Sequence, residues 1–318
     1  MLEKKVLFID AVHPLIYDKL EEAGYVCEFF RDYEYDDYLK IISDYEGIII
    51  RSGIKLNREI LQKAARLRFI GRVGAGMENI DVDFARSKGI QCCNSPEGSR
   101  DAVGEHAIGL LLTLMRNITV SDRQVRNGEW IREGNRGTEI RGKTIGIIGY
   151  GNMGSSFAEK LSGFGAKVIA YDKYKKNYSD PYVSETDMEE IYHDTDILSL
   201  HVPLTDETKY LFNREYLSNF KKNIFLINTA RGMNVNTADL VDGLKSGKVR
   251  GAAMDVLEYE DLSFEHLDKE NLPHAFQYLV RSDKVILTSH IAGWTHESKV
   301  RLAEVLVDKI LDDKTRRK

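Results

Sequence analysis

Three short stretches in the second half of the chain carry side chains suited to acid–base chemistry on a carboxylic acid. Arg231, in NTARG, has a planar guanidinium that can grip a carboxylate at two points. His290, in SHIAGWT, is the residue type that exchanges a proton near neutral pH. A carboxylate beside this histidine would favour its protonated form, and Glu258 and Glu260 in MDVLEYE are both candidates. Each residue also has an ordinary alternative: a surface ion pair, a strand-end histidine or a solvated acid.

A glycine-rich unit earlier in the chain predicts a dinucleotide site. Gly149, Gly151 and Gly154 follow an apolar, strand-like run at G-x-G-x-x-G spacing. In such a turn the first glycine makes the bend, the second admits a pyrophosphate and the third lets helix and strand pack closely. The helix predicted over 153–164 offers its N-terminal N–H groups to the phosphates. Asp172, at the end of the next strand, is placed to accept hydrogen bonds from a ribose diol and to repel a 2′-phosphate, so we predict NAD as the cofactor.

The acid–base residues and the dinucleotide unit fit one reaction when they are taken together. Hydride transfer between a nicotinamide and a 2-keto acid needs a cation for the carboxylate, a proton donor for the developing alkoxide and a group that keeps the donor protonated. Arg231, His290 and one of the two glutamates can supply these functions. The sequence therefore predicts an oxidoreductase, and it predicts no metal site.

The elements that must position these residues alternate between strand and helix, which is typical of parallel sheets covered on both faces. Between the strand predicted at 5–10 and that at 90–92, the first hundred residues show this alternation and are expected to form a domain of their own. One long helix over 100–127, apolar in its middle, is predicted to lead into the second domain. There the reactive stretches follow the C-terminal ends of strands, where open parallel sheets bind ligands.

A second glycine turn, GAGMEN, lies in the first domain after a predicted strand. It resembles a nucleotide fingerprint, but Asn79 stands where the third glycine would be, and the element that follows is short. The N–H groups of such a turn can hold a small anion such as a carboxylate. A simple tight turn is the alternative.

The composition excludes several classes of protein. A chain of 318 residues is long for one core and suggests about two domains. The net charge of −5 argues against nucleic acid as a partner, because binding it requires a basic surface. No apolar run is long enough to predict a membrane span. The 3 cysteines do not make a disulfide framework, and we expect a reducing, cytoplasmic setting.

The motifs, taken in order, resemble those of the D-isomer-specific 2-hydroxyacid dehydrogenase family over nearly the whole chain. The matching stretches are GRVGAGMENID, GIIGYGNMG, LHVPLTDET, INTARG, GAAMDVLEYE and SHIAGWT. The resemblance implies that Arg231 binds the substrate carboxylate, that His290 is the acid/base and that Glu260 is its acidic partner. It implies that the backbone of Val73 and Gly74 also holds the carboxylate. It further implies an NAD site lined by Asn152, Met153, Asp172, Val202, Thr229 and Asp255.

The same resemblance implies the architecture. We expect an α/β protein with two doubly wound parallel-sheet domains, in which a Rossmann NAD-binding domain (100–290) is inserted into a flavodoxin-like substrate domain (1–99 and 291–318). A homodimer is also implied by the family. The chain departs from the family where the family reads Glu-Pro: here Asp261 follows Glu260, and the longer stretch 262–282 leaves the local loop shape open.

Two arginines of the first domain bear on the identity of the acid. Arg51 and Arg72 match positions at which phosphoglycerate dehydrogenases resemble this chain, and a phosphate needs such cations. Salt bridges to nearby acids are the alternative. We predict oxidation of D-3-phosphoglycerate to 3-phosphohydroxypyruvate, a step of serine biosynthesis. Reduction of hydroxypyruvate, glyoxylate or another D-2-hydroxyacid couple is the second hypothesis, and an NADH-sensing interaction protein on the same fold is the third.

Overall fold

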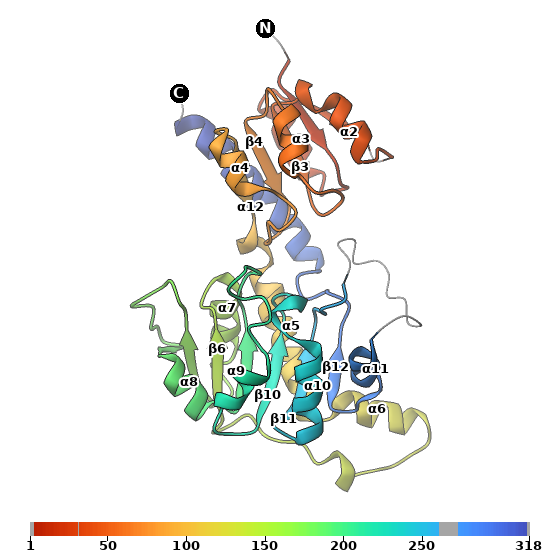
Figure 1. Cartoon of the computed structure of the whole chain (residues 1–318), viewed down its shortest axis with the longest axis vertical. Coiled ribbons are helices and arrows are strands. Elements are labelled where there is room, and N and C mark those ends of the chain that lie inside the picture. Colours follow the sequence, from red (N-terminus) through yellow and green to blue (C-terminus); the bar gives the residue numbers. More distant parts are fainter. Residues whose placement is uncertain (1–2, 31, 261–272, 317–318) are drawn as a thin grey trace. The chain divides into compact units, whose positions relative to one another are not determined.

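The computed structural model describes residues 3–30, 32–260 and 273–316 (Figure 1). The chain divides into two compact units. Unit 1 consists of Met1–Ser99 and Trp294–Lys318, and unit 2 of Arg100–Gly293. The sequence-based division placed the return to the first domain at residue 291, three residues before the boundary of the compact unit at Trp294.

Unit 1 contains a parallel sheet in which the described strands follow the order β2-β1-β3-β4-β5. Its strands are β1 (Lys5–Phe8), β2 (Val26–Phe29), β3 (Gly47–Ile50), β4 (Phe69–Arg72) and β5 (Gln91–Asn94). This order is that of flavodoxin-like folds, as predicted. All four residues of the central strand β3, Gly47–Ile50, are buried.

Helices cover both faces of this sheet. They are α1 (Leu15–Glu22) and α12 (His296–Arg316) on one face, and α2 (Tyr35–Ile41), the short 3₁₀ turn η1 (Ile42–Asp44), α3 (Arg58–Lys63) and α4 (Val82–Ser87) on the other. The C-terminal helix α12, blue in Figure 1, lies beside β4. Its Leu306 and Ile310 pack with Phe8 and Ile49 of the sheet. Residues from the two ends of the chain therefore build one core.

Unit 2 contains the larger sheet, in which the described strands are all parallel and follow the order β12-β11-β10-β9-β6-β7-β8. Its strands are β6 (Thr144–Ile148), β7 (Lys167–Tyr171), β8 (Ser184–Glu185), β9 (Ile197–Leu200), β10 (Ile224–Asn228), β11 (Val249–Met254) and β12 (Val285–Leu287). From β6 the chain winds outward through β7 and β8, and then crosses to β9 on the other side. This reversal between β6 and β9 is the switch point at which Rossmann folds bind their ligand.

Two buried apolar clusters cover the two faces of this sheet. Helices α5 (Pro96–Met115) and α7 (Asn152–Lys160) contribute to one cluster. Helices α8 (Met188–Asp194), α9 (Arg214–Asn219), α10 (Thr237–Ser246) and α11 (His274–Arg281) contribute to the other. The short 3₁₀ turns are η2 (Glu133–Asn135) and η3 (Gly232–Asn234). Among residues 3–30, 32–260 and 273–316, no helix has both the length and the apolar content to cross a membrane.

The prediction of one long helix over 100–127 is wrong. The structure has α5 and a separate helix α6 (Ile118–Arg126), divided at Asn117, whose φ of 53° is left-handed. Asparagine tolerates this conformation better than most residues, so it can end one helix and start the next. None of the α6 residues is buried. The departure at Asp261 and most of the stretch 262–282 lie outside the described residues, although α11 occupies the end of that stretch.

Candidate active site

The glycine turn after β6 has the geometry that a pyrophosphate requires. Gly149 has a left-handed φ of 91°, and a Cβ there would lie 2.5 Å from the carbonyl oxygen of His201. A Cβ on Gly151 would meet nothing within 4 Å, so open space adjoins the backbone at that point. A Cβ on Gly154 would lie 2.2 Å from the Gly149 oxygen, which shows how closely α7 packs against the turn. The three glycines thus provide a left-handed bend, open space beside the backbone and close packing of helix on strand, in the order of the motif.

The residues around this turn fit a bound dinucleotide. Helix α7 begins after Gly151, and no side chain caps its N-terminus, so its first N–H groups are available to donate hydrogen bonds to a phosphate. The hydroxyl of Thr229, at the end of β10, and Nδ1 of His201, at the end of β9, are buried and have no hydrogen-bond partner among the described residues. Buried polar atoms of this kind are costly unless a ligand or water satisfies them. Both lie at strand ends, where a Rossmann fold binds its cofactor.

Asp172 follows β7 and is held in place by three backbone N–H groups. Oδ1 accepts from Tyr174 at 2.9 Å and from Lys175 at 3.0 Å, and Oδ2 accepts from Tyr150 at 2.9 Å. Burial alone would raise the pKa of Asp172, but these hydrogen bonds outweigh it and hold the pKa below its usual range. The carboxylate is therefore charged and oriented beside the glycine turn, as recognition of a ribose and rejection of a 2′-phosphate require.

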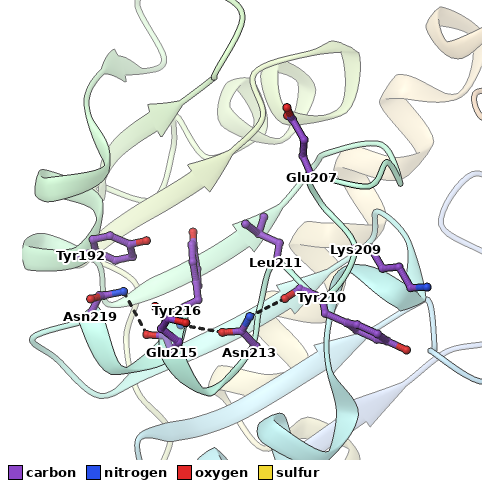
Figure 2. A pocket seen from close by; sticks show the side chains of 9 residues that line it. All are labelled: Tyr192, Glu207, Lys209, Tyr210, Leu211, Asn213, Glu215, Tyr216 and Asn219. Carbon is purple, nitrogen blue, oxygen red and sulfur yellow. Dashed lines mark hydrogen bonds between the residues drawn. The ribbon is translucent and has the colours of Figure 1, made fainter.

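A pocket of about 320 Å³ opens on the surface of unit 2, lined by residues of α8, α9 and the loop after β9 (Figure 2). Tyr192, Leu211 and Tyr216 form part of its lining. Glu207 on its rim accepts a hydrogen bond from Tyr174 at 2.5 Å, two residues after Asp172. None of the predicted catalytic or cofactor-binding residues lines this pocket, so the pocket is separate from the pair formed by His290 and Glu260.

His290 and Glu260 form a direct hydrogen-bonded pair. The distance between Nδ1 of His290 and Oε2 of Glu260 is 2.8 Å, and both side chains are partly buried. Because a carboxylate only accepts, Nδ1 of the imidazole carries the proton of this bond. The other oxygen of Glu260 accepts a hydrogen bond from the backbone N–H of Leu257. Nδ1 of His290 is therefore committed to Glu260.

The structure separates the two glutamates between which the motif residues alone did not decide. Glu258 accepts hydrogen bonds from the hydroxyl of Tyr210 and from the backbone N–H of Thr237, both at 2.9 Å. It therefore ties the loop after β9 to the start of α10, whereas Glu260 binds His290. The register of the family motif had pointed to Glu260.

Arg231 lies in a turn that two buried asparagines hold, and sequence reasoning did not single these out. Asn228 accepts from the N–H of Ala230 at 3.0 Å and donates to the carbonyl of Arg231 at 2.9 Å. Asn234 accepts from the N–H of Arg231 at 3.0 Å. Both asparagines are 0% exposed. The sequence signal that could have revealed this turn is the pair of asparagines on either side of Arg231, since asparagine side chains readily bond the backbone of tight turns.

Asp255, predicted to line the NAD site, also holds the loop that carries His290. Its carboxylate accepts from the hydroxyl of Thr288 at 2.6 Å and from the N–H groups of Ile291 and Ala292, both at 2.9 Å. Its backbone carbonyl accepts from the N–H of His290 at 2.8 Å. His290 has a left-handed φ of 55°, which is rare for a residue with a side chain and persists only where neighbours enforce it. Asp255 supplies that enforcement on both sides of the histidine.

The predicted residues of unit 1 cluster at the C-terminal ends of two neighbouring strands. Arg51 directly follows β3, and Arg72 ends β4, in register with the last residue of β3. The Arg51 guanidinium stacks on Trp294 at 4.4 Å. Burial lowers the pKa of Arg51, and no acid among the described residues lies within ion-pair distance of it. The expected alternative of a salt bridge is therefore not what the described part of the chain shows for Arg51.

The second glycine turn has its N–H groups divided into two sets. Val73 donates to the carbonyl of Ile50 at 2.9 Å, and Gly74 donates to the Ser95 hydroxyl at 3.2 Å. The next two N–H groups, of Ala75 and Gly76, have no acceptor among the described residues. The turn thus offers a small anion its later N–H groups, because those of the predicted pair, Val73 and Gly74, already have acceptors.

Unit 2 combines a parallel sheet that has a glycine turn at its switch point, the oriented carboxylate of Asp172 and a histidine–glutamate pair. These features are typical of NAD-dependent dehydrogenases. The profile of the family described as "D-isomer specific 2-hydroxyacid dehydrogenase, NAD binding domain" matches residues 108–292, and the chain belongs to this family. The predicted family and the predicted cofactor, NAD, are both confirmed. The protein is accordingly an NAD-dependent oxidoreductase of 2-hydroxy acids.

Comparison with individual proteins gives relatives with different substrates. The chain is 36% identical over 280 residues to a hydroxypyruvate reductase of Thermotoga maritima, covering 88% of each protein. It is 35% identical over 309 residues to a D-3-phosphoglycerate dehydrogenase of Methanocaldococcus jannaschii, covering 96% of this chain but only 56% of that protein. Among solved structures, a D-lactate dehydrogenase of Aquifex aeolicus complexed with NAD and lactic acid has a TM-score of 0.82 at 29% identity, with 98% and 95% of the two chains covered.

Proposed function

We propose that the protein oxidises D-3-phosphoglycerate at C2 to 3-phosphohydroxypyruvate, with NAD as the acceptor, and catalyses the reverse reduction. The observation that carries the choice of substrate is the placement of Arg51 and Arg72 at adjacent strand ends in unit 1. A phosphate carries about two negative charges, and arginine is the residue best suited to bind it at more than one oxygen.

The chemical step is assigned to the residues of unit 2. Nε2 of His290 takes the proton of the C2 hydroxyl, while the C2–H bond breaks and the C2–O bond becomes a carbonyl. Bound at the glycine turn after β6, NAD would supply the hydride acceptor. Glu260 stabilises the imidazolium that forms, because its Oε2 already bonds Nδ1 at 2.8 Å. Arg231 holds the substrate carboxylate. In the reduction, His290 returns the proton to the alkoxide oxygen.

We assign the remaining substrate contacts to unit 1, as its substrate-binding residues. The glycine turn gives the carboxylate its N–H groups, and those of Ala75 and Gly76 take this role in place of Val73 and Gly74. Arg51 and Arg72 take the phosphate. Arg72 reaches over the turn, since a Cβ on Gly74 would lie 1.6 Å from its Nη1.

Reduction of hydroxypyruvate or glyoxylate is the second candidate. It is favoured by the relative from Thermotoga maritima, whose length this chain covers to 88%, against 56% for the phosphoglycerate dehydrogenase of Methanocaldococcus jannaschii. An enzyme of that kind has no phosphate to bind, so Arg51 distinguishes the two candidates.

The deciding assay measures NADH oxidation with 3-phosphohydroxypyruvate, hydroxypyruvate, glyoxylate and pyruvate. We expect the highest kcat/KM with the phosphorylated acid. Arg51→Gln should lower that value by about 10- to 100-fold, the effect of losing a charge-assisted contact, and leave hydroxypyruvate reduction nearly unchanged. Arg58→Gln is the matched control, because Arg58 is another arginine of unit 1 stacked on an aromatic ring, that of Phe84 at 4.9 Å. Equal losses on phosphorylated and unphosphorylated acids would reject the phosphate role, and activity on none of the four would favour an NADH-sensing protein.

His290→Ala tests the acid–base assignment independently of the substrate. Turnover should fall by about 10²- to 10⁴-fold, the usual contribution of a positioned acid or base, while NADH binding, followed by its fluorescence, stays intact. A variant that keeps most of its turnover would reject the role of His290.

The homodimer and the cytoplasmic setting belong to the same proposal. Helix α6 and the residues after it expose large apolar side chains: Ile118 (49%), Val125 (50%), Trp130 (81%) and Ile131 (44%). Such surface is typical of an interface. Light scattering in solution should give twice the mass of one chain, and Trp130→Glu with Val125→Glu should give that of a single chain.

A further inference from the structure

The loop that carries His290 is held by a buried network that reaches beyond the residues assigned so far. The network contains Asp255, which is 1% exposed, and the hydroxyl of Thr288, which bonds Oδ1 of Asp255 at 2.6 Å. A second histidine, His106, enters it from helix α5. Its Nε2 lies 3.1 Å from Oγ1 of Thr288 and 3.3 Å from Oδ1 of Asp255.

The direction of these hydrogen bonds follows from the number of protons available. Thr288 has a single hydroxyl proton, and it donates this proton in the hydrogen bond to Asp255, because a carboxylate can only accept. Oγ1 of Thr288 can therefore only accept from His106, and so can Oδ1 of Asp255. Nε2 of His106 must carry a proton and donate it to both oxygens. His106 is thus the outermost donor of the network, whichever charge its ring has.

The network depends on this donor electrostatically. Burial alone would raise the pKa of Asp255, but the hydrogen bond from His106 is the largest of those that oppose burial, ahead of Thr288 and the N–H groups of Ala292 and Ile291. A buried carboxylate is costly unless its oxygens accept hydrogen bonds. Loss of the donor from His106 therefore destabilises the charged form of Asp255 and, with it, the hydrogen bonds from its other donors.

We propose that His106 is a positioning residue of the reaction, which fixes the left-handed conformation of His290 through Thr288 and Asp255. The inference rests on the proposed acid–base role of His290. His106 does not act on the substrate. It keeps Asp255 charged and oriented, and Asp255 in turn binds the N–H groups of Ile291 and Ala292 just after the catalytic histidine. Small displacements of a catalytic group are expensive, because an error of about 1 Å can cost on the order of 100-fold in rate.

Two substitutions at position 106 test this role. His106→Leu removes the donor, and we expect kcat to fall by about tenfold, as for one hydrogen bond to a charged group, with KM for NADH changed less than kcat. His106→Gln places an amide N–H where Nε2 was, and kcat should return to within about threefold of the parent by the same reasoning. A purely structural histidine would lower thermal stability in both variants without this rescue.

A double-mutant cycle covers the case in which His106→Leu folds poorly. Thr288→Val removes the hydroxyl at nearly unchanged volume, and kcat should fall in the soluble, folded variant. Because His106 acts through Thr288 and Asp255, the double variant should be less impaired than the product of the two single effects. The inference is overturned by an unchanged kcat in His106→Leu or in Thr288→Val, by a Gln variant as slow as the Leu variant, or by strictly multiplicative effects. His290→Ala, run alongside, reports on the acid–base role separately.

Discussion

The different surroundings of Glu258 and Glu260 predict that two neighbouring, chemically identical substitutions will have opposite consequences. Glu260→Gln keeps the size of the side chain and an oxygen that can still accept from Leu257, but it removes the charge beside His290. A hydrogen bond to a charged group contributes about 1.5–3 kcal/mol, and this one joins Nδ1 and Oε2 at 2.8 Å. If that contribution is made when the imidazolium is formed, kcat/KM should fall by about 10- to 150-fold.

Glu258→Gln is the matched control for this prediction. Its side chain holds two donors, Tyr210 and Thr237, and touches no reacting group. The amide oxygen can satisfy one donor but turns an N–H group toward the other. The free energy of unfolding should therefore fall by about 1–2 kcal/mol, while kcat stays within about threefold of the parent.

The assay is steady-state NADH oxidation on the best acid of the panel, together with urea unfolding of each variant. The reasoning predicts loss of turnover without loss of stability at position 260, and the reverse at position 258. It is refuted if the two variants lose turnover equally, or if Glu258→Gln is the slower enzyme. The same experiment separates the two assignments that the sequence motif left open before the family register was applied.

Three further predictions follow from backbone packing, burial and charge. Gly232→Ala should cost on the order of 100-fold in kcat/KM, since a Cβ there would lie 1.9 Å from the carbonyl oxygen of Leu257 and displace the Arg231 turn, whereas Gly163→Ala, which meets nothing within 4 Å, should be neutral. Burial lowers the pKa of His201 from 6.5 to about 4, so between these pH values the unfolded chain binds a proton that the folded chain does not. The contribution of His201 to the free energy of unfolding is therefore complete above pH 6.5 and is lost as the pH falls toward 4. Urea titrations at several pH values should show a flatter stability profile for His201→Asn. Asp172→Ser should reduce the preference for NAD over NADP, measured as the ratio of kcat/KM values, and a parent enzyme that uses both cofactors equally well would contradict the role of this charge.

The sequence predicted the two parallel sheets and the glycine turn after β6. Apolar runs and glycine spacing are local signals that do not depend on the completed fold. The sequence did not reveal the break at Asn117, since the apolar pattern continues across it and only the left-handed φ interrupts the helix. The helices α8 and α9 were not predicted, because six or seven residues alone carry too few turns to show a clear period.

Side-chain partners were the least predictable part of the candidate site. The spacing of Glu258 and Glu260 allows either to face His290, and the hydrogen bond from the Leu257 backbone decides between them in the folded loop. The N–H groups of Val73 and Gly74 are engaged by residues far away in the sequence, Ile50 and Ser95. Contacts of that kind depend on the completed fold and leave no local trace.

The packing of α12 on unit 1 also has a consequence for the order in which the protein is made. The strands β1–β5 are synthesised before unit 2, yet one face of their core includes Leu306, Val307 and Ile310, which follow unit 2 in the sequence. Burial of each such side chain contributes about 1.5–3 kcal/mol, and this contribution is not available until α12 has left the ribosome. Unit 2 is continuous in sequence and can complete its core earlier. Unit 1 therefore begins before unit 2 but completes its core after it, and one apolar face of its sheet stays uncovered in the meantime.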